Sequence, residues 1–90
     1  MKKYTKFTAD SVKKEFSLKL KRYIGPNKSI SYKQAARELE VEERTLGSWI
    51  RGEKQITLSS LLKILLYLPE EFTQEVLNIG RDIEQNPEYK

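Results

Sequence analysis

The segment SYKQAARELEVEERTLGSWIRG, from Ser31 to Gly52, constrains the fold of this 90-residue chain more than any other part of it. Ser31 and Gln34 stand in a capping-box pattern, which predicts that a helix begins directly after Ser31. Apolar residues then recur at helical spacing in two sets, Ala35, Ala36 and Leu39 followed by Leu46, Trp49 and Ile50. Gly52 is a residue type that commonly follows the end of a helix. The segment therefore predicts two short helices, Tyr32–Leu39 and Glu43–Arg51, joined by a tight turn and able to cross closely at the alanines.

Three further helices are predicted on the two sides of this segment. The first begins near Thr8 or Ala9 and ends at Gly25-Pro26, because this dipeptide breaks helices. The next covers Leu58–Tyr67, and the last begins at Pro69 and is expected to stop at Gly80. Their expected inward residues are Val12, Phe16, Leu20, Tyr23 and Ile24 in the first, Leu58, Leu61, Leu62, Leu65 and Leu68 in the next, and Phe72, Val76, Leu77 and Ile79 in the last.

The chain is therefore predicted to form one all-α domain of five helices, because 90 residues leave no room for a second core. Residues 9–80 make up this domain, residues 1–8 a flexible basic arm and residues 81–90 a polar tail. The lysine-rich start lacks the apolar run and cleavage site of a secretory signal. The apolar segment Leu58–Leu68 is far shorter than the roughly 20 residues that a membrane span needs. We therefore expect a cytoplasmic protein without membrane contact.

The charges are distributed unevenly along the chain. Residues 1–37 hold 11 Lys and Arg against 2 acids, residues 38–90 hold 6 against 11, and the whole chain has a net charge of +4. Such a polarised chain predicts one face suited to a polyanion, with lysine and arginine at the phosphates. The alternative interpretation is a lysine-rich helix that water alone solvates.

The residue types that carry most catalysis and metal binding are missing. The chain has no His and no Cys, and no glycine-rich loop is placed to hold a phosphate. Its acids are scattered over helix faces, and the carboxylates of Glu40, Glu42 and Glu43 alone do not make a metal site. The lack of cysteine also excludes a disulfide framework. We therefore expect no enzyme, no metal, no cofactor and no small-molecule ligand.

The pattern ISYKQAARELEVEERTLGSWIRG, followed by LSSLLKIL, is similar to the lambda-repressor/Cro-type helix-turn-helix family. The resemblance covers roughly Phe16 to Leu68 and rests on the alanines of the first motif helix and on Leu39, Val41, Thr45-Leu46, Trp49 and Gly52. It implies a compact five-helix lambda-repressor-like domain whose second and third helices form the helix-turn-helix. It also implies a sequence-specific double-stranded DNA-binding transcriptional regulator, repressor-like and of phage or mobile-element type.

In this family the start of the second motif helix faces base edges in the major groove. The resemblance places Glu42, Glu43, Arg44 and Ser48 there, and it places Tyr32, Arg51, Lys54 and Gln55 at the DNA backbone. Arg44 is the best base-contacting candidate, because a guanidinium can bond the O6 and N7 atoms of guanine together. The alternative for Arg44 is a surface ion pair with an acid such as Glu40. The charge distribution adds candidates for phosphate contacts, which are Lys13, Lys14, Lys21, Arg22, Lys28 and Lys33.

Two features differ from the family's pattern. Glu40 occupies the turn position usually held by glycine, where the backbone often needs a positive φ. Glu42 and Glu43 place two carboxylates at the end of the helix that is expected to enter DNA. These acids favour a second hypothesis, a protein-binding adaptor such as an antitoxin or a phage inhibitor that uses the same fold without DNA readout.

A homodimer is also expected, because one short recognition helix gives limited affinity and two half-sites are the usual remedy. The apolar residues of the last helix are the predicted dimer interface, namely Phe72, Val76, Leu77 and Ile79. The alternative is that these residues pack on the first and fourth helices of their own chain.

Overall fold

A computed structural model describes residues 7–89 of the chain as a set of six α-helices. In chain order these are α1 (Ala9–Leu20), α2 (Tyr32–Leu39), α3 (Glu43–Ile50), α4 (Leu58–Tyr67), α5 (Glu70–Leu77) and α6 (Ile79–Gln85). Within residues 7–89 there is no strand, only an isolated bridge between Ile24 and Ile30 in the loop before α2. The predicted all-α class is therefore confirmed. None of the helices in this range is long and apolar enough to cross a membrane.

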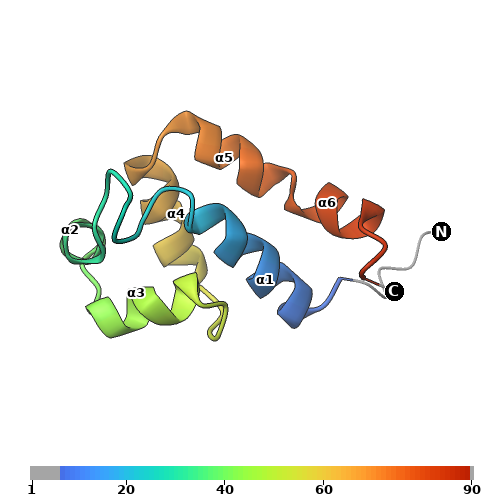
Figure 1. Ribbon diagram of the computed structural model, residues 1–90, viewed down its shortest axis with the longest axis horizontal. Helices are drawn as coiled ribbons and strands as arrows, with labels where there is room; N and C mark the ends of the chain where they lie inside the picture. Colours follow the sequence, from blue (N-terminus) through green and yellow to red (C-terminus); the bar gives the residue numbers. More distant parts are fainter. Residues whose placement is uncertain (1–6, 90) are drawn as a thin grey trace.

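Helix α1 lies at the centre of the molecule, between two groups of helices (Figure 1). It packs against α5 and α6 on one side and against α3 on another. Helix α2 packs on α3 and α4, and α4 also contacts α5, so the chain closes around α1. This arrangement places α2 and α3 at the opposite end of the molecule from α6 (Figure 1).

Hydroxyl side chains cap three of the helices. Thr8 forms a capping box at the start of α1. Ser31 Oγ accepts a hydrogen bond from the backbone N of Gln34 at 3.1 Å, and Thr57 Oγ1 accepts one from the backbone N of Ser60 at 3.2 Å. Each bond satisfies an N–H group that the first turn of a helix leaves without a helical partner. The predicted starts of α2 and α4 are therefore confirmed.

The core forms around α1 and includes residues from all six helices. Phe72 of α5 is fully buried, and its ring makes edge contacts with the rings of Phe16 (5.9 Å between centroids) and Tyr23 (5.4 Å). The buried apolar residues are Phe16, Leu20, Ile24, Ala35, Ala36, Leu39, Leu46, Trp49, Ile50, Ile64, Leu68, Phe72, Ile79 and Ile83. Phe72 and Ile79, which the sequence places in a dimer interface, are thus core residues of a single copy, and Val76 packs against the same core. Of the four interface candidates only Leu77 is exposed.

Helix α4 presents only part of the predicted face to the core, because Leu61 and Leu65 pack against it but Leu58 and Leu62 do not. Ile64 is fully buried and Leu68 is buried, whereas Leu58 and Leu62 point outward. Leu66 is the most exposed of the large apolar residues described. Because this helix is apolar almost all round, its sequence pattern does not distinguish the inner face from the outer one.

The last part of the chain also departs from the prediction, because the expected fifth helix is two helices that meet at Asn78. Gly80 lies inside α6 and does not end a helix. A Cβ at Gly80 would stand 3.2 Å from the ring of Phe7, so this glycine makes room for a ring rather than stopping a helix. The helix continues to Gln85 in what the sequence presents as a polar tail, because Ile83 is fully buried against the core.

Candidate nucleic-acid interface

The turn between α2 and α3 depends on one residue in the left-handed conformation. Glu40 has φ 56° and ψ 44°, and it is the only non-glycine residue with positive φ among those described. Its backbone N donates to the carbonyl of Arg37 at 3.2 Å, and that of Val41 donates to the carbonyl of Ala36 at 3.0 Å. These two bonds are those of a Schellman motif, which closes a helix end through a left-handed residue. The positive φ predicted at Glu40 is therefore confirmed.

This strained turn predicts a stabilising substitution. Glu40→Gly should raise the free energy of unfolding by about 1 kcal/mol, because the left-handed conformation costs an L-residue about 1–2 kcal/mol and costs glycine almost nothing. Glu38→Gly is the matched control: Glu38 lies inside α2, where glycine should destabilise by about 1 kcal/mol. Urea denaturation of both variants measures the two effects. A loss of stability in both would mean that Glu40 is not strained.

Helix α3 is held in place from its inner face and from its C-terminal end. Leu46, Trp49 and Ile50 are buried. The hydroxyl of Ser17 in α1 donates a hydrogen bond to the carbonyl of Ile50, which is one of the carbonyls that a helix end leaves free. The chain then leaves the helix through Gly52, whose φ is 73°. The first turn of α3 is thereby fixed in orientation while its outer face stays open.

The outer face of α3 carries the residues predicted to contact bases. Glu42, Glu43 and Arg44 are exposed, whereas Ser48 is half-buried. The Ser48 hydroxyl donates to the carbonyl of Thr45 at 2.7 Å, so its oxygen remains available as an acceptor. No side chain caps this helix. The predicted base-contacting residues therefore lie on one surface, at the start of α3 and one turn further on.

Gly47 is buried because an arginine covers it. A Cβ at Gly47 would stand 2.9 Å from Nη1 of Arg51. Arg51 also bonds through Nε to Glu53 at 3.0 Å, and this bond raises the pKa of its guanidinium, with a smaller contribution in the same direction from Tyr32. The glycine in the middle of α3 thus gives space to an intramolecular side chain. Arg51, a predicted DNA-backbone contact, is already paired to an acid.

The basic helix α1 does not form a cationic face, which corrects the interpretation drawn from the charge distribution. Lys13 pairs with Asp10 of the same helix at 3.4 Å. The other pairs join α1 and the turn after it to acids of the second half of the chain: Lys14–Glu88 at 3.5 Å, Lys19–Asp82 at 2.8 Å and Arg22–Glu75. The two charged halves of the sequence therefore neutralise each other where α1 meets α5, α6 and the segment after α6. Arg22, predicted at the DNA backbone, forms one of these pairs, and its side chain is 64% exposed.

The cations between residues 28 and 54 differ from those of α1. Within residues 7–89, no ion pair is formed by Lys28, Lys33, Arg37, Arg44 or Lys54, and all five are exposed. Arg44 therefore does not form an ion pair with Glu40, which is the alternative to a base contact that the sequence leaves open. Arg37 is the member of this set that the sequence analysis missed, although it belongs to the basic half of the chain. These side chains come from the loop before α2, from α2, from α3 and from the loop after it.

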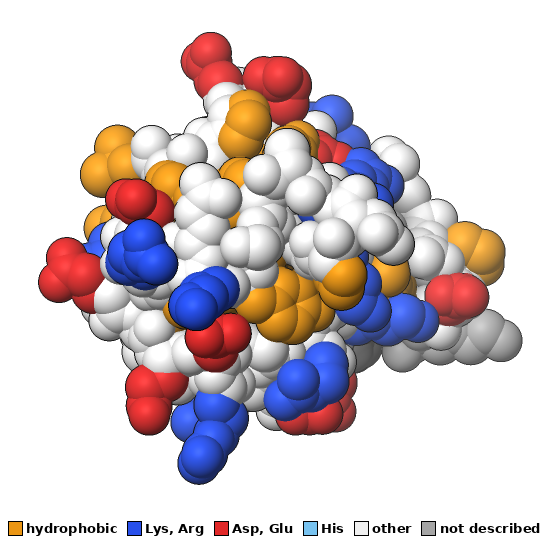
Figure 2. All heavy atoms as spheres, turned by 60° about the vertical axis from the view of Figure 1, so that its left-hand side comes forward, with side chains coloured by type: hydrophobic (Ala, Val, Ile, Leu, Met, Phe, Trp, Pro, Cys, Tyr) orange, Lys and Arg blue, Asp and Glu red, His pale blue; other side chains and the backbone are white. Residues whose placement is uncertain are grey.

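Acids lie among these cations. Residues 25–55 contain six Lys and Arg against five Glu. Figure 2, which turns the α2 and α3 end of the molecule toward the viewer, shows basic and acidic side chains interspersed and no continuous basic patch. The surface therefore suits a partner that meets individual cations at defined points better than it suits a partner attracted by charge alone.

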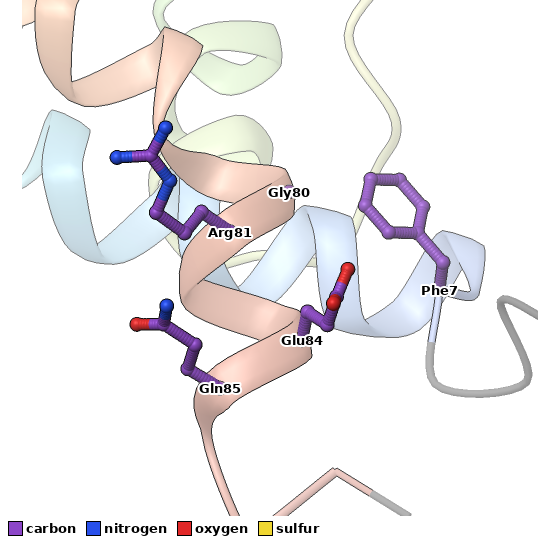
Figure 3. A pocket seen from close by; sticks show the side chains of 5 residues that line it. All are labelled: Phe7, Gly80, Arg81, Glu84 and Gln85. Carbon is purple, nitrogen blue, oxygen red and sulfur yellow. The ribbon is translucent and has the colours of Figure 1, made fainter. Parts of the chain in front are cut away.

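Two cavities are described, and the smaller, of about 380 Å³, borders this surface, because Lys54 and Gln55 belong to its lining. The larger, of about 720 Å³, is lined by Phe7, Gly80, Arg81, Glu84 and Gln85. Figure 3 shows Arg81 and Gln85 on one side of α6 and Glu84 and Phe7 on the other, so these side chains do not converge on one point. Among the residues described, no group of three acids could hold a metal ion. Neither feature makes a catalytic site.

Comparison with family models, with curated proteins and with solved structures finds no match to this chain.

Proposed function

We propose that the chain is a sequence-specific DNA-binding regulator of the lambda-repressor/Cro type, acting in the cytoplasm, in which α2 and α3 form a helix-turn-helix. The observation that carries this proposal is that some basic side chains form ion pairs with acids and others do not. The basic side chains of α1 pair with acids, whereas Lys28, Lys33, Arg37, Arg44 and Lys54 have no ion-pair partner within residues 7–89. These five come from the loop before α2, from α2, from α3 and from the loop after α3, and a phosphate backbone could pair with them.

In the proposed complex the start of α3 enters the major groove. Arg44 reads a guanine through two parallel hydrogen bonds, and Ser48 lies one turn further along the same surface. Lys33 at the start of α2, Lys28 before it, and Lys54 with Gln55 after α3 contact the phosphates on the two sides of the groove. Tyr32 is half-buried, and its hydroxyl is the part that can reach a phosphate.

The two carboxylates at the start of α3 determine what kind of binding follows. Glu42 and Glu43 are exposed and approach the phosphates together with Arg44, so they weaken binding to any sequence. Glu43 can recover part of this cost only by accepting a hydrogen bond from the N4 amino group of cytosine. The proposal therefore predicts weak non-specific affinity and a comparatively large preference for a particular site.

Arg44→Ala tests the proposal directly. Duplexes bound by the full chain are selected from a random pool, and the selection is repeated with the variant. Loss of the bidentate contact should weaken binding to the preferred site by about 1–3 kcal/mol and relax the preference at one base pair. Arg81→Ala is the matched control, because Arg81 is also an exposed arginine but belongs to α6, at the opposite end of the molecule. Equal weakening on all sequences would make Arg44 a phosphate contact.

The acids at the start of α3 also favour the second candidate, a protein-binding adaptor that keeps this fold without reading DNA. The two candidates differ in one simple measurement, the binding of the full chain to a random duplex at low salt. A DNA-binding regulator should bind detectably there, since phosphate contacts strengthen as salt falls. No binding under these conditions would reject the regulator and leave the adaptor.

A further inference from the structure

A row of leucines runs along the outer face of α4. Leu58, Leu62 and Leu66 follow one another at four-residue steps, and their exposed fractions are 72%, 52% and 88%. Steps of four keep side chains on one face of a helix, and this row is about 12 Å long. Single exposed leucines are ordinary, whereas a continuous exposed row in a chain with 33% charged residues indicates a contact surface.

The helix that carries the row is almost without charge. Between Thr57 and Leu68 the sequence contains one charged residue, Lys63, and no acid. The partner that covers this face is therefore itself apolar, because a charged partner surface would lose its water without gaining an opposite charge. The helix that carries the row has the required chemistry, so a second copy of α4 is a suitable partner.

The two ends of the row differ in shape. At the Leu58 end, a groove of about 380 Å³ opens beside the helix. Its lining is mostly apolar and includes Leu58, Leu61 and Ile56, with Lys13, Lys54 and Gln55 as its charged and polar members. At the other end Leu66 is the most exposed large apolar side chain described. The Leu58 end of the row therefore borders a hollow, and the Leu66 end protrudes.

We propose that α4 is the contact surface between two copies of this chain, packed antiparallel about a two-fold axis near Leu62. The antiparallel arrangement brings Leu66 of each copy to Leu58 and the groove of the other. Ser59, a small exposed residue next to Leu58, leaves space for the incoming side chain. The contact occurs twice by symmetry and closes, so it yields a dimer and not a fibre.

The expected dimer is a weak one. A standard interface buries about 800 Å² on each partner, and three leucines supply only part of this area. The contact therefore extends to the flanking residues of α4, and we expect dissociation in the micromolar range. The row itself contains no proposed DNA contact, whereas Lys54 and Gln55, proposed at the phosphates, line the groove beside it. The dimer is therefore measured without DNA.

Sedimentation of the full chain over a range of concentrations tests the proposal. The wild-type chain should pass from monomer to dimer, and Leu66→Glu should weaken the association about 100-fold or more, because each dimer loses two buried leucines and gains two buried carboxylates. Leu77→Glu is the matched control: Leu77 is 71% exposed, belongs to α5 and lies outside the row, so this variant should dimerise like the wild type. A wild-type chain that stays monomeric at the highest concentration would overturn the proposal.

Cross-linking distinguishes this dimer from one formed elsewhere. The chain has no cysteine, so Leu62→Cys introduces a single thiol near the proposed axis. Oxidation should then link two copies through this residue, whereas Leu77→Cys should yield little dimer. Efficient linkage of both variants, or of the Leu77→Cys chain alone, would show that α4 is not the contact surface.

Discussion

Phe72→Ala should lower the free energy of unfolding by about 3–5 kcal/mol, the loss typical of a buried phenylalanine replaced by alanine. Phe72 is fully buried in α5, and its ring contacts the edges of the Phe16 and Tyr23 rings. The variant loses the burial of a whole ring and leaves a cavity, because helices on several sides hold the walls apart. A domain of this size has a total stability of roughly 5–15 kcal/mol, so the variant should be close to unfolding at room temperature.

Urea denaturation measures this loss, and Leu77→Ala is its control. Leu77 lies on the same helix but is 71% exposed, so its replacement should change stability by no more than about 0.5 kcal/mol. The pair also separates the two interpretations of α5 that the sequence leaves open. If the Phe72→Ala chain kept its stability but lost self-association, Phe72 would belong to a dimer interface and not to the core.

Lys19→Met should destabilise the fold by about 3 kcal/mol, since removal of one partner from a buried ion pair leaves the other charge uncompensated. Lys19 and Glu15 of α1 are both buried. The Lys19 ammonium lies 2.8 Å from a carboxylate oxygen of Asp82 in α6 and 3.9 Å from one of Glu15. Methionine keeps the apolar stem of the side chain, so the variant removes mainly the charge. The Glu15 carboxylate then remains buried without a cation.

The Lys19→Met result is measured by urea denaturation at neutral pH with two comparisons. Lys14→Met removes an exposed partner of Glu88 from the same helix and should cost at most about 0.5 kcal/mol. The double variant Lys19→Met with Glu15→Gln should recover part of the loss, because it removes the stranded charge as well. No recovery in the double variant would contradict the explanation through Glu15.

Tyr89 belongs to the same buried network. Its hydroxyl donates to a carboxylate oxygen of Glu15 at 2.7 Å, and burial together with this bond raises the pKa of Tyr89 to about 12. Because the folded pKa is raised, the hydroxyl remains protonated and keeps donating throughout the neutral range. This polar network attaches the segment after α6 to α1, and no local sequence pattern predicts it.

The helices that begin at hydroxyl caps were the most predictable part of the molecule. The starts of α2 and α4 depend on Ser31 and Thr57, which bond to N–H groups three residues away, so the information is local. The positive φ of Glu40 was predictable from the resemblance, because the family usually has glycine at this turn position. The exposure of Arg44 follows from the same pattern, because the buried residues of α3 define its opposite face.

Three features were not predictable in this way, namely the outer face of α4, the role of Gly80 and the pairing of the charges. Leucine fills both faces of α4, so only its contacts with α2 and α5 select Ile64 for the core and leave Leu66 outside. Gly80 resembles a helix end locally, but it lies against a ring that comes from the start of the chain.

Local sequence patterns therefore predict where most helices begin and which face of α3 carries Arg44, because caps, turns and helical periodicity act over a few residues. Which cations are paired depends instead on contacts between helices that are far apart in the sequence. The ion pairs that join α1 and the turn after it to the second half of the chain connect residues 53 to 74 positions apart, and such distant partners meet only when the helices pack. The Ser31–Gly52 segment thus encodes most of the candidate interface, and the packing of α1 on α5 and α6 pairs Lys14, Lys19 and Arg22 with acids.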